Sequence, residues 1–269
     1  MFDEGERPKV RNALLVTTAA AWILLLGQGG PMAMTAHHHT GAMPLGASLR
    51  MFVAMNPPGS FLAGWTLMLI AMMAPALVMP VSHLRVRSFN SRRARATALF
   101  LCGYVGVWIA AGAALAALAF AIAIVAGAEA PAYVSRLVAG AAAPAYLALV
   151  AAFVWQCSPI KQRCLNRCHA DPELAAFGRS ADRDALVFGA THGLWCAGSC
   201  WALMLVPLLL PGWHLAAMAA VTLLIAGERI ERPGAPRWAL RGAGKATRIV
   251  IAQSRLAVRS HLAALRPVA

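Results

Sequence analysis

The chain has 269 residues, of which 60% are hydrophobic and only 13% are charged. Soluble domains are roughly half apolar and carry about a quarter charged residues, so this composition excludes an ordinary soluble protein. The net charge of +14 would suit a nucleic-acid partner. However, the basic residues lie in the gaps between long apolar runs and not on one domain surface, which argues against nucleic acid.

Six apolar runs are long enough, or nearly long enough, to cross a bilayer. A hydrocarbon core of about 30 Å needs roughly 20 apolar residues in a helix, and these runs are too long for barrel strands. The sequence therefore predicts an all-α, polytopic transmembrane helix bundle. Its expected spans are residues 12–28, 61–82, 97–126, 134–156, 184–210 and 212–227.

The basic residues predict the orientation of these spans, because Lys and Arg concentrate in cytoplasmic connections. All 24 of them except Arg50 and Arg136 lie in the N-terminal flank, the second and fourth connections and the tail. This alternation predicts six spans with both termini in the cytoplasm. The excess of Ala, and of Arg over Lys, is typical of a GC-rich bacterium, so we expect a multi-pass protein of a bacterial inner membrane.

The predicted spans divide the chain into four parts. Residues 1–28 form a cytoplasmic flank and the first helix, 29–60 an external connection, 61–228 a five-helix membrane core and 229–269 a basic cytoplasmic tail. The first run could also be a secretory signal peptide. We favour an anchor because the apolar run is at the long end for a signal and no A-x-A cleavage site follows it.

The tail carries a periodic pattern of charge. At 100° per residue, its basic residues from Arg237 to Arg266 fall mostly on one face. This pattern favours an amphipathic helix on anionic lipids of the inner leaflet. A disordered basic tail is the alternative.

The external connection is rich in methionine and histidine. His37, His38 and His39 stand in a row between Met34 and Met43, with no acidic residue nearby. Short His-rich tracts are typical of metal-binding segments, and thioether beside imidazole narrows the metal toward copper. The tract predicts metal capture, although three tandem histidines can also arise by chance.

The second span places methionines at helical spacing. Met68 and Met72 are i, i+4 neighbours near mid-depth, and Met73 follows. Pro75 and Pro80 free backbone carbonyls and permit a kink. Thioethers are soft ligands that select Cu(I), but Met also fills gaps in any apolar interior.

The fifth span carries a row of potential soft ligands. The spacing of His192, Cys196 and Cys200 places them along one helix face. An ionisable His within a span is a functional candidate, whereas free Cys also packs as a small hydrophobe. Three glycines among them would let a neighbouring helix approach closely: Gly189, Gly193 and Gly198.

The fourth connection holds further thiols, with Cys157 followed by Cys164 and Cys168. The C-x3-C spacing suits one face of a helix and is not the C-x2-C of zinc ribbons. Neighbouring Lys161, Arg163 and Arg167 are expected to lower the pKa of these thiols. Metal, redox and structural roles stay open here.

Several stretches together resemble a bacterial family of predicted metal-binding integral membrane proteins, a domain of unknown function. The resemblance rests on Trp65, Met68 and A-M-M-A-P (71–75), on Gly103, Tyr104 and Trp108, on Gln156, Pro159, Lys161, Cys164 and Cys168, and on G-L-W-C-A-G-S-C-W-A-L-M (193–204). It covers about residues 61–230 and implies a shared helical fold. It draws attention to Met72, Met73, Cys164, Cys168, Cys196 and Cys200. Many members carry a second Cys where this chain has Ser199, so one potential thiol ligand is missing here.

Ordered by depth, these groups form a ladder across the membrane, from the external Met and His residues through Met68, Met72, Cys200 and Cys196 to His192 and then to Cys164 and Cys168. The ladder requires the second and fifth spans to pack together. It predicts a protein that captures Cu(I) outside and passes it inward or delivers it to a membrane oxidase or metal chaperone, with zinc as the weaker alternative.

Two other functions stay open. One is a thiol–disulfide membrane oxidoreductase that uses Cys196 with Cys200 and Cys164 with Cys168. The other is a non-catalytic subunit of a larger membrane complex. No nucleophile elbow, P-loop or dinucleotide fingerprint is present in the sequence, and we predict no catalytic residue.

Overall fold

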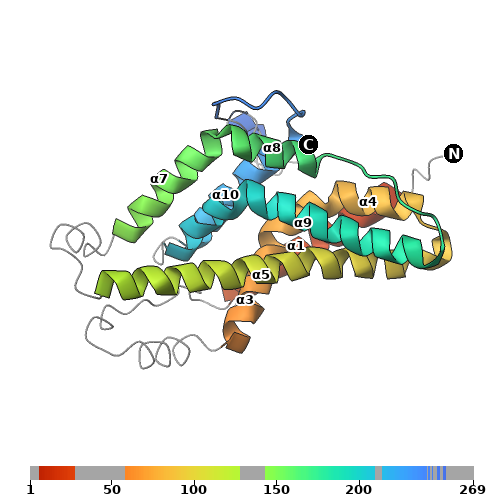
Figure 1. The fold of residues 1–269 in the computed structure, drawn as a ribbon, viewed down its shortest axis with the longest axis horizontal. Coiled ribbons are helices and arrows are strands. Elements are labelled where there is room, and N and C mark those ends of the chain that lie inside the picture. Colours follow the sequence, from red (N-terminus) through yellow and green to blue (C-terminus); the bar gives the residue numbers. More distant parts are fainter. Residues whose placement is uncertain are drawn as a thin grey trace, which may run out of the picture.

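The computed structural model describes residues 6–27, 58–127, 143–209 and 214–240, together with residues 242, 244, 247–248 and 251–252 of the tail. The regular structure in these ranges is helical, which confirms the predicted all-α class. Figure 1 shows the longer helices, which are α1 (Glu6–Gly27), α3 (Pro58–Met73), α4 (Val78–Arg87), α5 (Arg93–Gly127), α7 (Ala143–Cys157), α8 (Pro159–Cys168), α9 (Gly178–Leu209) and α10 (His214–Ile230).

Three helical stretches in the described ranges are long and apolar enough to cross a membrane: Glu6–Gly27, Leu62–Arg87 and Asn90–Ala117. They correspond to the first three predicted spans, and α7, α9 and α10 overlap the other three. The arrangement of six spans with both termini in the cytoplasm stays a prediction. Several helices begin before their apolar runs, because polar residues at the basic ends continue the same helix.

The second span is broken at Pro75, one of its two prolines, whereas Pro80 lies within α4. A short 3-10 turn, Ala74–Leu77, separates α3 from α4 and contains Pro75. Proline lacks the N–H that an α-helix needs for its i to i−4 hydrogen bond. The chain therefore changes direction between α3 and α4 (Figure 1).

Helices α5 and α9 lie side by side and form the most extensive helix pair (Figure 1). Glycines make this possible: a methyl group on Gly189 would overlap the carbonyl oxygen of Phe100, and one on Gly103 would overlap that of Leu186. A Cβ at Gly193 would lie 3.1 Å from the backbone oxygen of Tyr104. The predicted role of the fifth-span glycines is confirmed, since they let the backbones of α5 and α9 meet.

Ion pairs connect the basic ends of several helices. The buried Glu6 carboxylate lies 2.8 Å from the Arg85 guanidinium and 3.1 Å from that of Arg93. Asp182, near the start of α9, pairs with Arg95 at 2.7 Å and also with Arg92. These contacts bring together three segments that the charge count assigns to one side of the membrane.

The beginning of the tail crosses α8 without forming a helix. Residues 231–240 have no regular structure. The Arg237 backbone N–H donates to Gln162 Oε1 at 3.0 Å, and that of Ala239 donates to the Cys157 carbonyl at 3.1 Å. The surface helix expected for the tail therefore does not include Arg237, whose backbone finds its partner on α8. The basic residues beyond it, apart from Arg248, lie outside the described residues.

The close packing of α5 and α9 gives a stability prediction. We expect Gly189→Ala to lower the melting temperature in detergent, because separating the two backbones costs about 1–3 kcal/mol. Gly106→Ala is the matched control on α5, where a Cβ would meet no atom within 4 Å. Circular dichroism melts in one detergent compare the variants. Equal melting of Gly189→Ala, Gly106→Ala and the parent would contradict this packing.

Candidate functional site

The thiols of the fourth connection lie beside those of the fifth span. Cys164 and Cys168 stand one turn apart on α8, and Cys196 and Cys200 one turn apart on α9, against which α8 packs. All four side chains are buried. The sequence predicts these two cysteine pairs at different depths of the membrane, but in the structure they lie at the same height along α9.

The sequence around residue 158 explains why α8 forms. The Ser158 hydroxyl accepts the backbone N–H of Lys161 at 3.1 Å, and Pro159 occupies the first turn. Serine at the N-cap and proline directly after it are strong helix-start signals. Because Cys164 and Cys168 are i, i+4 neighbours, one face of this helix carries both thiols.

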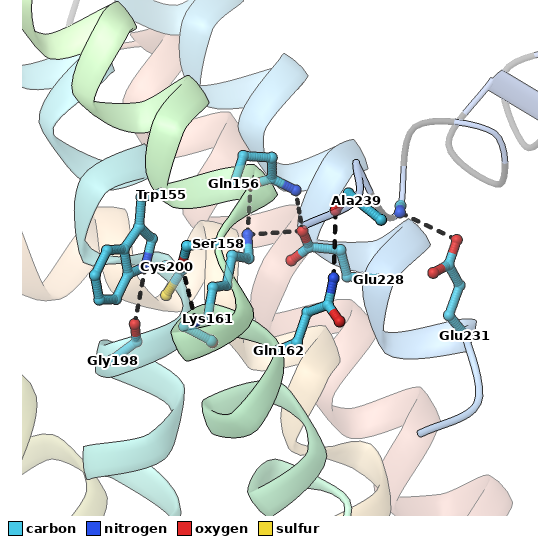
Figure 2. A network of polar contacts seen from close by, with 12 residues as sticks. Trp155, Gln156, Ser158, Lys161, Gln162, Gly198, Cys200, Glu228, Glu231 and Ala239 are labelled. Atoms are coloured by element: carbon cyan, nitrogen blue, oxygen red, sulfur yellow. Dashed lines mark hydrogen bonds and ion pairs between the residues drawn. The ribbon is translucent and has the colours of Figure 1, made fainter. Parts of the chain in front are cut away.

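Three contacts fix α8 and the adjoining end of α7 on α9. A Cβ at Gly198 would lie 3.1 Å from Cys164 Sγ, so the missing side chain lets α8 approach. The indole N–H of Trp155 donates to the Gly198 carbonyl at 3.1 Å (Figure 2). On the outer side, the Arg167 guanidinium lies over the Trp195 ring, 5.1 Å from its centroid, in cation–π contact.

Cys196 lies at the meeting point of four helices. Arg229 Nη2, at the end of α10, donates to Cys196 Sγ at 3.1 Å, and the Tyr104 hydroxyl of α5 lies 3.4 Å from the same sulfur. Arg229 also forms a side-chain hydrogen bond with Cys168 of α8. One guanidinium therefore contacts a thiol from each of the two pairs. Cys200 makes a different contact, in which its thiol donates to the Cys196 carbonyl at 3.0 Å.

Burial determines the pKa of the two α8 thiols, contrary to the lowered values expected from the basic residues beside them. Removal from water raises the pKa of Cys164, and it raises the pKa of Cys168 to about 12 although the Arg229 charge acts in the opposite direction. Arg163 and Arg167 do not lower these values because their side chains are exposed while the thiols are buried. The charge of Lys161 is balanced by Glu228. The predicted lowering of the thiol pKa values is wrong.

His192 lies one turn before Cys196 in an aromatic environment. Its side chain is buried, and the rings of Phe100, Phe188 and Tyr104 surround it with centroids 6.0–6.1 Å away. Its Nε2 atom is buried without a hydrogen-bond partner among the described residues. An unpaired buried nitrogen is costly, which keeps His192 a candidate ligand.

The methionines of the second span lie in the same hydrophobic core as Cys168, Cys196 and Cys200. Met68, Met72 and Met73 are all buried on α3. This helix packs against α1, α5 and α10 and makes little direct contact with α9. The direct packing of the second and fifth spans on which the ladder depends is therefore slight. His37, His38 and His39 lie outside the described residues.

A buried polar network that the sequence reasoning missed lies next to the thiols (Figure 2). Lys161 Nζ is 2.7 Å from the Glu228 carboxylate, and each side chain is 2% exposed. The Gln156 amide bonds to both, donating to Glu228 and accepting from Lys161. One feature of the sequence indicates such a network: an acidic and a basic residue, Glu228 and Arg229, stand next to each other at the end of an apolar run.

No group of three or more His, Cys, Asp or Glu side chains is placed to hold a metal ion together in the part of the chain that the structure describes. The arrangement instead offers pairs of thiols. Thiolate sulfur is the soft donor that Cu(I) prefers.

A family model described as PpoB2, copper chaperone, matches residues 62–252, which is most of the chain. The chain belongs to the PpoB2 copper chaperone family. Comparison with curated proteins and with solved structures gives no match. PpoB2 membership narrows the expected metal-binding family to one that handles copper, and a chaperone role implies handling without catalysis. The matched range contains all four thiols and Arg229, whereas α1 and the His tract precede it.

Lys161 and Glu228 form a buried ion pair in this PpoB2 chain, so we expect mutations of the two residues to have strongly non-additive effects on stability. Lys161→Met leaves the Glu228 carboxylate buried without its cation, which we expect to cost about 3–5 kcal/mol of stability. Adding Glu228→Met should recover part of that loss, because no unpaired carboxylate remains. The recovery is incomplete because the buried Gln156 amide loses its hydrogen bonds to both side chains. Arg163→Met, on the exposed face of α8, is the control. Melting temperatures in one detergent measure the cycle, and purely additive losses would contradict a coupled pair.

Proposed function

We propose that this protein is a membrane copper chaperone that receives Cu(I) on the thiols of α8 and α9. The observation that supports this is the meeting of four buried thiols, Cys164, Cys168, Cys196 and Cys200, in a chain of a copper chaperone family. Copper is the cargo of this function. Soft thiolates bind Cu(I) well, and their burial would shield a bound ion from water and oxidants.

The exposure of the thiols suggests where copper leaves. Cys164 and Cys168 on α8 are 9% and 7% exposed, whereas Cys196 and Cys200 on α9 are 0% and 1% exposed. We infer that α8 forms the side of the site from which an acceptor takes the ion. A membrane oxidase or another metal chaperone would be such an acceptor.

The entry route follows from the distribution of soft ligands. His37, His38 and His39, with the methionines around them, would capture copper outside, and Met68, Met72 and Met73 on α3 would lie between that tract and the thiols. Because α10 and α5 contact both α3 and α9, a transfer from methionine to thiol would pass along these two helices.

Copper is favoured over zinc as the cargo. Structural zinc sites are tetrahedral and need four ligands, and among the described residues the thiols are not placed in a group of three or more that could hold one ion. Cu(I) accepts two sulfur donors. A thiol–disulfide oxidoreductase has less support than copper handling, because the family to which the chain belongs is one of copper chaperones.

Metal content tests the proposal. We expect the parent protein, loaded anaerobically with Cu(I) in detergent and desalted, to retain copper that a variant with all four thiols changed to Ser does not. Cys102→Ser/Cys157→Ser, which alters two thiols outside the group, is the matched control and should retain copper like the parent. Size-exclusion profiles and helical circular dichroism verify that each variant is folded. Equal, near-zero copper in the parent and the four-serine variant would contradict the function.

A further inference from the structure

We propose that Cys168 and Cys196 form a two-coordinate Cu(I) site that bridges α8 and α9, and that Arg229 balances its charge. This inference rests on the proposed copper function and names which thiols hold the ion. It also assigns a role to an arginine that would otherwise count only as one basic residue of the tail.

The two sulfur atoms share one hydrogen-bond partner, Arg229. Arg229 Nη2 donates to Cys196 Sγ at 3.1 Å, and the same side chain hydrogen-bonds Cys168. Both thiols therefore lie around one guanidinium, although they come from different helices. Of the other two thiols, Cys200 hydrogen-bonds the carbonyl and the side chain of Cys196, its neighbour on the same helix, and Cys164 lies against Gly198. The hydrogen bonds of Arg229 to thiols go to Cys196 and Cys168.

Arg229 also lacks an anion. Its Nε is buried with no hydrogen-bond partner, and the ion pairs found among the described residues do not include it. Arginine stays protonated in proteins. Arg229 is half-buried, and a charge partly removed from water without an anionic partner is costly. An anion placed at the two sulfurs would remove this cost.

The charge of the complex supplies that anion. One Cu⁺ ion enters, two S–H bonds lose their protons to the buffer, and two Cu–S bonds form. The pair of neutral thiols thereby becomes a bis-thiolate complex of charge −1, with no electron transferred. Together with Arg229 the loaded site is neutral. The Tyr104 hydroxyl, 3.4 Å from Cys196 Sγ, is placed to donate to the same sulfur.

Cu(I) affinity, measured by competition with a Cu(I)-specific chelator on the full chain in detergent, tests the role of Arg229. Arg229→Gln should weaken binding at least about tenfold, equivalent to about 1.4 kcal/mol, and Arg229→Lys should weaken it less because the charge remains. Arg163→Gln, an exposed arginine on α8, is the control and should stay within about threefold of the parent. Unchanged or tighter binding by Arg229→Gln overturns the charge-balancing role, because tighter binding would mean that the guanidinium repels copper.

Single-thiol variants test the choice of ligands. Cys168→Ser and Cys196→Ser should each abolish tight binding, while Cys164→Ser and Cys200→Ser should stay within about threefold of the parent. X-ray absorption of the loaded parent should show two sulfur neighbours. A nitrogen neighbour, as from His192, or copper retained by Cys168→Ser, would overturn the pair.

These outcomes are separable from failure of the copper function. A parent that binds no Cu(I) contradicts the function itself, whereas binding that depends on Cys164 and Cys200 contradicts only the assigned pair. Should Arg229→Gln not yield monodisperse protein, Arg229→Met replaces it as the variant without the charge. The four single-serine variants, which keep Arg229, decide the choice of ligands.

Discussion

The position of α8 depends on the buried ion pair between Lys161 and Glu228. This helix is polar, and its inward face includes Lys161 and Gln162, each 2% exposed. Such a face packs against an apolar bundle only when its charges and amides are satisfied. Glu228 and Gln156 satisfy the ammonium group, and the backbone of the tail satisfies Gln162. An ion pair of this kind contributes more to the specific placement of an element than to net stability.

That placement determines which thiols can meet. Because α8 lies at Gly198 and Trp195, its two cysteines face α9 at the level of Cys196 and Cys200. Glu228 and Arg229 are adjacent at the end of α10, so the residue that holds α8 is next to the one that contacts the thiols. A shift of α8 along α9 would move Lys161 from Glu228 and Cys168 from Arg229 together. Stability and the candidate site are therefore coupled through one turn of α10.

Much of the fold follows from local sequence. Apolar runs predict the long helices, Pro75 predicts the break after α3, and the glycines around His192 predict a close neighbour, which is α5. The i, i+4 spacing of each cysteine pair is also correct, since it depends only on helix geometry.

The relation between the two cysteine pairs could not be predicted from sequence. Ranking residues by depth assumes that the fourth connection lies outside the depth range of the fifth span. In the structure, α9 already begins at Gly178, and α8, which belongs to that connection, packs along α9. The predicted lowering of the thiol pKa values was wrong for a related reason. Proximity to Arg163 and Arg167 in the sequence does not determine which way those side chains point. Arg229 was counted with the tail because its contact with Cys196 joins residues 33 positions apart.

The charge around Arg229 bears on which ion the site accepts. With both thiols deprotonated, Cys168, Cys196 and Arg229 carry a net charge of −1, which one monovalent cation neutralises. A divalent ion at the same two sulfurs would leave an excess positive charge next to a guanidinium, in surroundings where an unbalanced charge is costly. It would also lack the further ligands that zinc normally takes. In the proposed site, Arg229 would disfavour divalent metals by charge while the thiol pair would favour Cu(I) by softness, so two independent physical terms would select the same cargo.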